Sequence, residues 1–397
     1  MNDSSRPEPL RIYCAAHSAE PGGAEWCLDT FLQGFDRTRF DVSVGFAAEG
    51  PMVARAQAAG CRVEIPYFSW WLGYERSWWY WKNLLGRGLF RIRRLARTLR
   101  REKVRAVYTN SAVVFEAALA ARRARVPHVW HVHEVLTPNY WPTRLLSLPA
   151  IRRRIGRWSV RVVFESQAAR KAAPEVPSEK VAVVPNPVRF SRDAVPSPEQ
   201  ARAAGQAFRR RHGIPLDKTL ILWLGRFSER KDPLAALEAF RRVNGDEAVL
   251  VFAGEGPLET VLRERISESG SSNRVFALPF VHDVREALAA ADALLLTSRE
   301  ESFGLVLVEA GAMAKPVVAT ATQGPREIVS HDRTGLLVPP GDLGALVGAL
   351  QRVIADSALR ARLGAAAQEH VWAEYDPALY VERLQSLLES AASGGLP

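Results

Sequence analysis

Short runs of apolar residues alternate along the chain with longer segments of mixed apolar and polar character. Predominantly apolar runs occur at residues 11–16, 40–48, 219–224, 248–253 and 291–298. Runs of this kind are typical of strands in a parallel sheet that is covered on both faces. The segments between them have the length and the Ala and Leu content of helices. Because strands and helices alternate in both halves without a repeat of solenoid length, the pattern predicts an α/β protein with two doubly wound sheets.

The chain of 397 residues is long enough for two domains of ordinary size. We expect an N-terminal Rossmann-like domain over residues 1–190 and a C-terminal one over residues 214–375. Residues 191–213, which are rich in Pro, Ala, Arg and Gln, are expected to form a linker with a short helix. The final helix, residues 376–397, should cross back onto the first domain.

Positive charge is concentrated in the first half of the chain. Residues 1–190 contain 30 Lys and Arg against 16 Asp and Glu, whereas the remainder contains 23 against 27. This imbalance indicates an anionic partner for the first half: a membrane surface, a phosphorylated acceptor or nucleic acid. The three cysteines form no paired pattern, so we expect a reducing, cytoplasmic compartment. We expect neither a signal peptide nor a membrane-spanning segment, because no run of about 18 apolar residues is present.

The stretch from Ser298 to Glu309 combines two carboxylates with a turn of small residues. Its surroundings predict a strand, a loop that contains Glu301 and a helix in which Glu309 lies about two turns from the start. The N–H groups at a helix start suit a diphosphate, and a carboxylate suits the paired hydroxyls of a ribose. The stretch could therefore hold a nucleotide sugar along its length. A solvated loop and an ordinary helix surface are the alternatives.

This stretch resembles the Glu-x7-Glu motif of the family 4 retaining glycosyltransferases, which have the GT-B fold of two Rossmann-like domains facing each other across a cleft. By this resemblance, Glu309 would hold the ribose, and Glu301 would hold hydroxyls of the transferred sugar near the carbon that reacts. The loop residues that would contact the donor are Ser302, Phe303, Gly304 and Leu305. The resemblance is strongest over residues 219–342, as expected for a shared donor site beside a variable acceptor site.

Two cations and several glycines resemble other parts of the family's donor site. Arg226 follows a buried strand directly and Lys231 lies five residues later, so both suit a diphosphate leaving group. The glycines that would lie against the donor are Gly23, Gly254 and Gly256. For Gly23, an ordinary tight turn from strand into helix is the alternative, and the glycines alone favour that turn.

A histidine at a strand end completes the expected site. His133 closes an apolar run, with His131 two residues earlier on the same strand face. In the family, a histidine in this position lies near the transferred sugar. The resemblance therefore implies Glu301, His133, Arg226 and Lys231 as the catalytic residues. The alternative for a lone strand histidine is a structural group with satisfied hydrogen bonds.

Three positions depart from the family's pattern. Glu165 stands where the family usually has a small residue, and Pro279 and Gln323 stand where glycines are common. These departures leave open the local loop shapes and the contacts to the donor base or sugar.

Residues 68–105 form an unusual segment that is rich in Trp and Arg. Between Arg87 and Arg105 there are nine basic residues against one acid, Glu102, and apolar residues recur at steps of three and four. We expect this segment to contact an anionic membrane surface or a lipid-linked acceptor. An ordinary surface helix and a single-stranded nucleic-acid site are the alternatives, the latter without an accompanying motif. The residues expected to make the contact are Trp70, Trp71, Trp78, Trp79, Trp81, Arg91 and Arg94.

The resemblance implies transfer of a sugar, with retention, from a nucleoside-diphosphate sugar to an acceptor hydroxyl. The expected acceptor is a lipid-linked or membrane-proximal glycan of cell-surface polysaccharide assembly, reached from the inner face of the membrane. No Asp-x-Asp pair occurs, so we expect no metal and no other cofactor. Lys231→Ala is expected to abolish turnover with little loss of folding. The alternatives are a GT-B nucleotide-sugar epimerase or phosphorylase, and a non-catalytic protein that binds a membrane surface.

Overall fold

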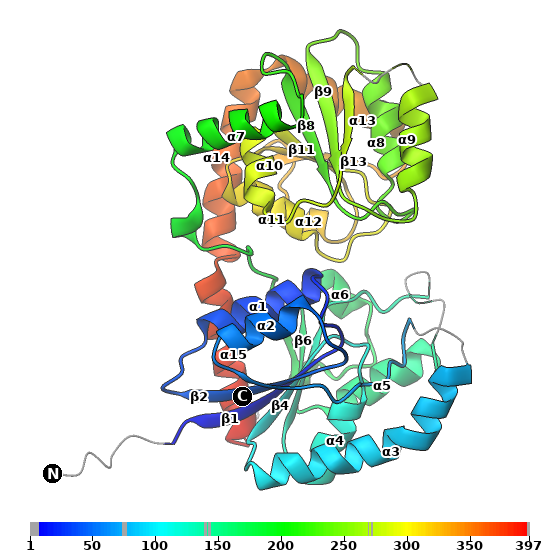
Figure 1. Ribbon diagram of the computed structural model, residues 1–397, viewed down its shortest axis with the longest axis vertical. Coiled ribbons are helices and arrows are strands. Elements are labelled where there is room, and N and C mark those ends of the chain that lie inside the picture. The colour runs from blue at the N-terminus through cyan, green and yellow to red at the C-terminus, as the bar shows by residue number, and fades with distance from the viewer. Residues whose placement is uncertain are drawn as a thin grey trace, which may run out of the picture. The chain divides into compact units, whose positions relative to one another are not determined.

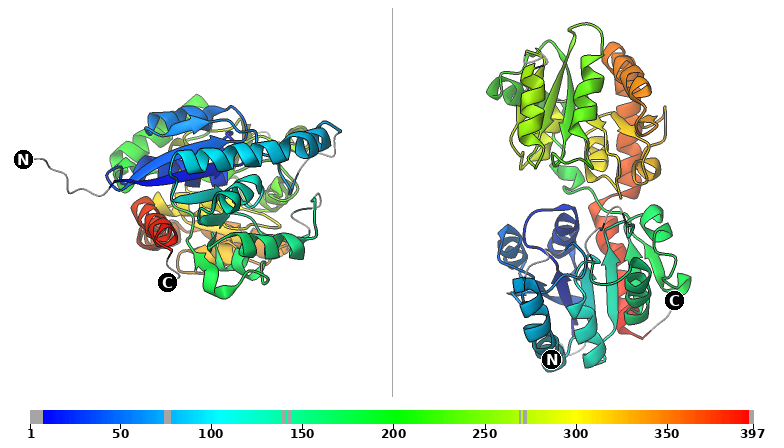
Figure 2. Two further views of the ribbon diagram at one scale, coloured as in Figure 1. Left: turned by 90° about the horizontal axis from the view of Figure 1, so that it is seen from below. Right: turned by 90° about the vertical axis from the view of Figure 1, so that its right-hand side faces the viewer.

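The computed structural model describes residues 8–394 apart from 74–77, 139–140, 142–143, 269 and 271–272, and it describes residues 78–85 as helical backbone only. The chain forms two compact units, Met1–Arg189 with Pro377–Pro397, and Phe190–Asp376. Each unit has helices packed on a parallel sheet (Figure 1, Figure 2). The predicted fold class, α/β with two doubly wound sheets, is confirmed.

The first unit is built on a sheet that, within the described part of the chain, has seven strands in the order β3-β2-β1-β4-β5-β6-β7. All neighbouring strands are parallel. The winding direction reverses between β1 and β4, and ligands of doubly wound sheets bind at the carboxyl edge of such a switch point. The strands are β1 (Leu10–Ala16), β2 (Phe40–Phe46), β3 (Arg62–Glu64), β4 (Ala106–Asn110), β5 (His128–Val132), β6 (Arg161–Phe164) and β7 (Val181–Val183).

One helix of the first unit comes from the far end of the chain. Helix α15 (Pro377–Ala392) lies beside α1 (Gly23–Gly34). The side-chain oxygen of Gln385 accepts a hydrogen bond from the Asp36 backbone N–H over 2.7 Å, and Arg39 pairs with Glu389 at 2.6 Å. The C-terminal helix therefore belongs to the first unit. The other helices of this unit are α2 (Pro51–Ala58), α3 (Trp78–Arg101), α4 (Glu116–Ala124), α5 (Leu148–Trp158) and α6 (Gln167–Lys171).

The second unit has a parallel sheet of six strands among its described residues, in the order β10-β9-β8-β11-β12-β13. Its switch point lies between β8 and β11. The central strands are apolar and buried along almost their whole length, because helices cover both faces of the sheet. The strands are β8 (Thr219–Leu224), β9 (Ala248–Ala253), β10 (Val275–Leu278), β11 (Ala293–Leu296), β12 (Val317–Thr320) and β13 (Gly335–Val338).

Residues 191–213 are part of the second unit, and the expectation of a separate linker is wrong. Helix α7 (Pro198–Arg211) packs against α10 (Val284–Ala290). The buried guanidinium of Arg209 donates to the Ala290 carbonyl over 2.7 Å and to Asp292 over 2.8 Å. The other helices are α8 (Pro233–Arg241), α9 (Glu259–Glu268), α11 (Leu305–Ala312), α12 (Pro325–Ile328), α13 (Leu343–Ala355) and α14 (Ser357–Glu374).

Candidate functional site

In the second unit, the loops after β8 and β11 meet at the switch point of the sheet. Lys231 lies in the first loop and Glu301 in the second. The Thr297 hydroxyl donates a hydrogen bond to the Asp232 carbonyl over 2.8 Å, which fastens the two loops together. The strand order thus brings Lys231 and Glu301 to one place although they are distant in sequence.

Lys231 and Glu301 form a buried ion pair. Lys231 Nζ contacts Glu301 Oε2, and the Ser298 hydroxyl donates to the same oxygen over 3.1 Å. The Lys231 and Glu301 side chains are only 17% and 6% exposed. Burial by itself raises the pKa of Glu301, but the charge and hydrogen bond of Lys231, helped by Arg230 and Ser298, leave that pKa below its ordinary value. Glu301 is therefore ionised at neutral pH and can accept hydrogen bonds from hydroxyl groups.

Two glycines shape the loop that carries Glu301. Gly304 is the N-cap of α11 and has a φ of +101°, in the left-handed region. Gly324, after β12, donates its N–H to the Glu301 carbonyl over 2.9 Å, and a Cβ at Gly324 would lie 2.2 Å from the Phe303 carbonyl oxygen. Helix α11 starts without a side-chain cap, as suits a helix start that binds an anion.

Close backbone contacts also explain the glycines after β9. A Cβ at Gly254 would lie 1.9 Å from the Gly225 carbonyl oxygen, and one at Gly256 would lie 2.5 Å from that of Phe227. The loops after β8 and β9 therefore pack at a distance that only glycine allows. Arg226 lies in the same β8 loop, is exposed, and forms no ion pair with any residue that the structure describes.

Glu309 lies earlier in its helix than the sequence predicted. It is the fifth residue of α11, about one turn from the helix start rather than two. It is also fully buried, as Ser302 and Phe303 nearly are, and the Phe303 ring packs edge-on to Tyr375 with centroids 5.7 Å apart. Leu305 is the first residue of α11. A ribose contact at Glu309 stays a prediction.

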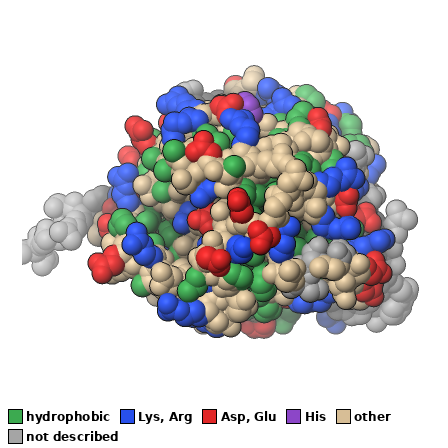
Figure 3. All heavy atoms as spheres, turned by 90° about the horizontal axis from the view of Figure 1, so that it is seen from above, with side chains coloured by type: hydrophobic (Ala, Val, Ile, Leu, Met, Phe, Trp, Pro, Cys, Tyr) green, Lys and Arg blue, Asp and Glu red, His purple; other side chains and the backbone are tan. Residues whose placement is uncertain are grey.

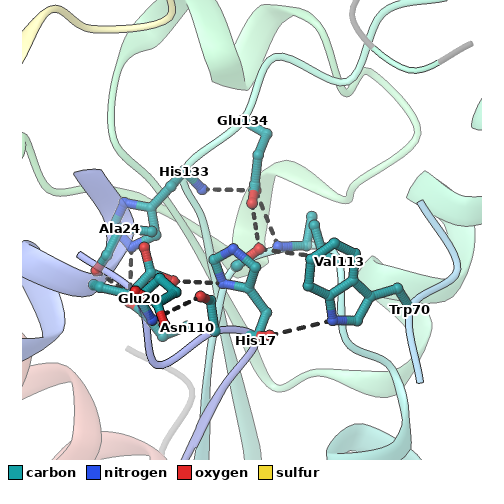
Figure 4. A network of polar contacts seen from close by, with 12 residues as sticks. His17, Glu20, Ala24, Trp70, Asn110, Val113, His133 and Glu134 are labelled. Carbon is teal, nitrogen blue, oxygen red and sulfur yellow. Dashed lines mark hydrogen bonds and ion pairs between the residues drawn. The ribbon is translucent and has the colours of Figure 1, made fainter. Parts of the chain in front are cut away.

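In the first unit, polar groups gather at the switch point between β1 and β4 (Figure 4). Gly23 is the first residue of α1, in the connection after β1. Asn110, the last residue of β4, donates its side-chain N–H to the Ala24 carbonyl over 2.9 Å. This contact holds the start of α1 against the end of β4.

The start of α1 already carries a carboxylate of the protein. His17 Nδ1 lies 2.9 Å from Glu25 Oε1, a contact that is an ion pair when the imidazole is protonated. Burial lowers the pKa of His17, but Glu25 and then Glu134 outweigh it, so the pKa is raised overall. A diphosphate at Gly23 would meet the negative charge of Glu25, which weakens the expectation of a donor contact there.

His133 follows β5 directly, and protein groups engage both of its ring nitrogens. Nε2 lies 2.9 Å from Asn110 Oδ1, and Nδ1 lies 3.1 Å from Asn186 Oδ1. The ring stacks on His131 with centroids 3.9 Å apart, and the Glu165 carboxylate lies 3.8 Å away. In this conformation His133 holds the ends of several strands together and offers neither nitrogen to a ligand. Its contact with the transferred sugar stays a prediction.

Glu134 is a site residue that sequence reasoning missed. The Ser111 hydroxyl contacts one of its carboxylate oxygens, and the backbone N–H groups of Ala112 and His133 donate to the other over 3.0 Å each. Ser111 has a φ of +103°, so this buried carboxylate holds a strained turn in place. The signal in the sequence was a set of polar residues, Asn110, Ser111 and Glu134, directly after two neighbouring apolar runs.

Two residues that were expected to contact a membrane surface or a lipid-linked acceptor have partners within the first unit. Trp71 is 2% exposed and stacks on Trp130 and Trp158 with centroids 5.6 and 5.8 Å apart. Arg91 pairs with the buried Glu116 at 2.6 Å. The expectation is wrong for Trp71, because the sequence does not show which aromatic side chains turn inward. For Arg91, whose side chain is 14% exposed, it stays a prediction.

The remaining residues of the Trp- and Arg-rich segment have different surroundings. Trp70 is partly buried and donates its indole N–H to the His17 carbonyl over 3.2 Å (Figure 4), whereas Arg94 is exposed. Along the second half of α3, Leu95 and Leu99 face the core of the unit, so that apolar face is not free for a bilayer. Trp78, Trp79 and Trp81 lie outside the residues whose side chains the structure describes.

Acidic and basic side chains are mixed on the face that Figure 3 shows. Figure 3 views the molecule from the end at which the second unit is drawn in Figure 1, and basic and acidic side chains are intermingled there. This agrees with the nearly balanced composition of residues 191–397.

No helix in the described part of the chain has both the length and the apolar character needed to cross a bilayer.

Two family models match the chain, one on each unit. The model described as Glycosyltransferase Family 4 matches residues 21–192, and the model described as Glycosyl transferases group 1 matches residues 205–370. The second match contains the Lys231–Glu301 pair.

Two curated relatives match just under half of the chain. The D-inositol 3-phosphate glycosyltransferase of Xylanimonas cellulosilytica is 36% identical over 195 residues, which cover 48% of this chain and 46% of the relative. The lipopolysaccharide core biosynthesis glycosyltransferase LpsE of Rhizobium meliloti is 31% identical over 176 residues, or 44% of this chain and 51% of LpsE. The chain spans about half the length of these curated relatives.

Solved structures match over nearly the whole chain. The crystal structure of Anabaena HepE in complex with UDP has a TM-score of 0.79 and 24% identity, and covers 96% of this chain and 100% of HepE. WaaG, a glycosyltransferase involved in lipopolysaccharide biosynthesis, has a TM-score of 0.67 and 17% identity over 97% of this chain and 99% of WaaG. These likenesses show the fold and confirm the predicted GT-B architecture.

Proposed function

Because this chain belongs to the group 1, family 4 glycosyltransferases, we propose that it transfers a sugar, with retention, from a nucleoside-diphosphate sugar to an acceptor hydroxyl. The observation that carries the proposal is the ion pair of Lys231 and Glu301 at the switch point of the second sheet. A buried cation beside a buried carboxylate provides one group for a leaving phosphate and one for sugar hydroxyls.

The donor in this proposal is a nucleotide sugar bound by the second unit. HepE, which shares the fold, has been solved with UDP and with UDP-glucose. In this chain the uncapped start of α11 suits the diphosphate, and the exposed Arg226 can reach a ligand without breaking an ion pair among the described residues. Glu309 would then hold the ribose, which requires its fully buried carboxylate to become accessible to the donor.

The transfer breaks the bond between the anomeric carbon and the diphosphate oxygen, whose electron pair leaves with the nucleoside diphosphate. The acceptor oxygen bonds to the same face of that carbon and gives its proton to the departing diphosphate oxygen. Negative charge therefore grows on the leaving oxygen, and the positive charges of Arg226 and Lys231 stabilise it. The ammonium group of Lys231 has three N–H donors, so it can keep its contact with Glu301 while it reaches a phosphate oxygen. Glu301 in turn places negative charge near the developing positive charge of the sugar.

We further propose that the reaction needs no metal ion. In this scheme, fixed protein cations and backbone amides take the place of a divalent cation, in keeping with the lack of an Asp-x-Asp pair in the sequence. We expect the protein to keep its activity after treatment with a chelator. Addition of Mg²⁺ or Mn²⁺ should then not raise the activity further. An absolute need for either ion contradicts this part of the proposal.

The acceptor in this proposal is a membrane-proximal or lipid-linked glycan of cell-surface polysaccharide assembly, modified at the inner face of the cytoplasmic membrane. Several relatives carry names from such assembly, including lipopolysaccharide core biosynthesis and a putative teichuronic acid biosynthesis enzyme. The basic first half of the chain suits an anionic acceptor.

The test begins with a thermal-shift screen of nucleoside diphosphates and nucleotide sugars, since a ligand of the native state raises the unfolding midpoint. The donor found is then assayed for release of nucleoside diphosphate, and the anomeric configuration of the product is read by NMR. Lys231→Ala should lose about 100- to 1000-fold in kcat. Lys218→Ala is the matched control, because Lys218 pairs with the exposed Asp246 in the same unit. Inverted product, an epimerised sugar or release of free sugar alone contradicts the proposal.

A further inference from the structure

A large cavity lies in the first unit between α3 and the loops that follow β1, β2 and β3. Its volume is about 1210 Å³. Residues 64–70 line one side, and α3 lines the other from Gly86 to Thr98. His17 and Ser18, directly after β1, also line it. The cavity therefore reaches the carboxyl edge of the sheet, where His17 and Glu25 form the ion pair described above.

Aromatic side chains dominate the apolar part of this cavity. Phe68 and Leu95 are buried in its lining and Trp70 is partly buried. Tyr67 and Phe90, in contrast, are 63% and 60% exposed, which is unusual for side chains of this size. Tyr67 also has a φ of +55°, a conformation that non-glycine residues adopt at a cost. Large aromatic groups held open at a concave surface are typical of a ligand site.

The cationic part of the cavity comes from one face of α3. Arg87, Arg91 and Arg94 recur at steps of four and three and all line the cavity. Arg91 is already occupied, because it pairs with Glu116 and donates to the Ser69 hydroxyl over 2.6 Å. Arg87 and Arg94 are exposed, and neither has an ion-pair or hydrogen-bond partner among the described residues. Two such guanidinium groups suit the oxygens of a phosphate.

The acidic groups of the cavity leave this positive charge in place. Glu64 lines the cavity, and its Oε1 accepts a hydrogen bond from the Tyr13 hydroxyl over 2.6 Å. Glu116 forms an ion pair with Arg91, and its side chain is 1% exposed. With Arg91 paired to Glu116, the lining keeps two exposed guanidinium groups, Arg87 and Arg94, against the one carboxylate of Glu64, so its net charge is positive.

We propose that this cavity binds the acceptor, and that the acceptor is an organic phosphate with an apolar chain. The inference rests on the proposed function, whose acceptor it specifies. The chain lies against Tyr67, Trp70 and Phe90, and the phosphate lies against Arg87 and Arg94. The glycan that the phosphate carries, whose hydroxyl receives the sugar, lies on the side of His17, at the switch point of the sheet.

The shape of the site favours a single lipid phosphate over a bilayer surface. Leu95 and Leu99 of α3 are buried in the unit, so this helix cannot lay its apolar face into a membrane. Leu89 is 57% exposed beside Phe90 but does not line the cavity. A bilayer would contact Leu89 and Phe90 alike, whereas a ligand in the cavity would contact only Phe90.

The test is isothermal calorimetry of the full chain with farnesyl phosphate, farnesol and inorganic phosphate, without donor. Farnesyl phosphate should bind at one site. Farnesol lacks the phosphate and inorganic phosphate lacks the apolar chain, so each should bind at least about tenfold more weakly. Phe90→Ser and Arg94→Glu should each weaken farnesyl phosphate by about tenfold or more. The matched controls are Leu89→Ser and Arg93→Glu, whose side chains are equally exposed on α3 but do not line the cavity; these should change the affinity by less than about twofold.

Several outcomes overturn the proposal. Equal binding of inorganic and farnesyl phosphate means a site for free phosphate, and equal losses in Leu89→Ser and Phe90→Ser mean a non-specific apolar surface. Co-sedimentation with phosphatidylglycerol vesicles that depends equally on Arg93 and Arg94 means a membrane surface. The thermal shift given by nucleoside diphosphates is measured separately and should persist in all four variants. If the wild type shows no such shift, the proposed function fails, but the calorimetric result still decides what the cavity binds.

Discussion

Lys231 and Glu301 are 70 positions apart in the sequence and in direct contact in the second unit, where each lies in the loop that follows a strand beside the switch point. The contact makes the catalytic candidates part of the folded core of the unit. By itself, the sequence predicts that Lys231→Ala changes folding little. The ion pair changes this prediction, because the truncation leaves a carboxylate that is 6% exposed without its cation.

Lys231→Met is therefore expected to lower the free energy of unfolding by about 3 kcal/mol, since breaking a buried pair on one side is costly. The double variant Lys231→Met with Glu301→Gln removes both charges and should recover most of that loss, while its kcat stays at least about 100-fold below that of the wild type. Urea unfolding of the wild type, the single variant and the double variant measures the effect. Equal stabilities of the single and double variants contradict a role of the pair in folding.

The stability contributed by Glu301 should depend on pH in the acid range. The folded pKa of Glu301 lies below its ordinary value of 4.5, so between the two values the unfolded chain binds more protons than the native one and stability rises with pH. The contribution of Glu301 to stability is fully present above about pH 4.5 and is lost as the pH falls through the folded pKa. Urea midpoints of the wild type and Glu301→Gln, compared from pH 6 to pH 3, should converge toward the acid end. A constant difference between the two proteins over this range contradicts the assignment.

Gly324 should tolerate no side chain, for a reason of packing alone. A Cβ there meets the Phe303 carbonyl oxygen at 2.2 Å, and the clash with backbone displaces the loop that holds Glu301. Gly324→Ala is expected to destabilise the protein by about 2 kcal/mol and to abolish the thermal shift given by nucleoside diphosphates. Gly348→Ala, in the middle of α13 with no atom within 4 Å, is the control and should be stabilising by about 0.5–1 kcal/mol. Donor binding that survives Gly324→Ala means that this loop does not contact the donor.

Trp71 should behave as a core residue. Its ring stacks on Trp130 and its indole N–H donates to the Ala112 carbonyl over 2.5 Å, so Trp71→Ala removes both packing and a hydrogen bond. We expect a loss of about 3–5 kcal/mol in the free energy of unfolding. Phe90→Ala, at an exposed aromatic of the same segment, should change it by no more than about 0.5 kcal/mol. Similar values for the two variants, measured by urea unfolding, contradict the assignment of Trp71 to the core.

Some features of the site follow from local sequence, and others do not. The apolar run of β8 predicts a buried strand, and Arg226 and Lys231 after it are strand-end cations whatever the rest of the chain does. The span 191–213 has the composition of a linker, yet Arg209 within it is buried, because its partners Ala290 and Asp292 come from a distant part of the chain. The composition of a segment indicates how polar the segment is. It does not indicate which carbonyl and carboxylate groups from distant parts of the chain the segment contacts in the fold.

The sequence by itself determined the two doubly wound sheets and the presence of polar groups at their strand ends, because apolar runs, glycines and helix patterns act over a few residues. Only the tertiary structure decided that Lys231 meets Glu301, that both nitrogens of His133 are engaged, and that Trp71 lies inside while Phe90 lies open beside a cavity. These relationships depend on strand order and on which face of each helix is covered. Both are set by packing between segments far apart in the chain, which no local pattern records.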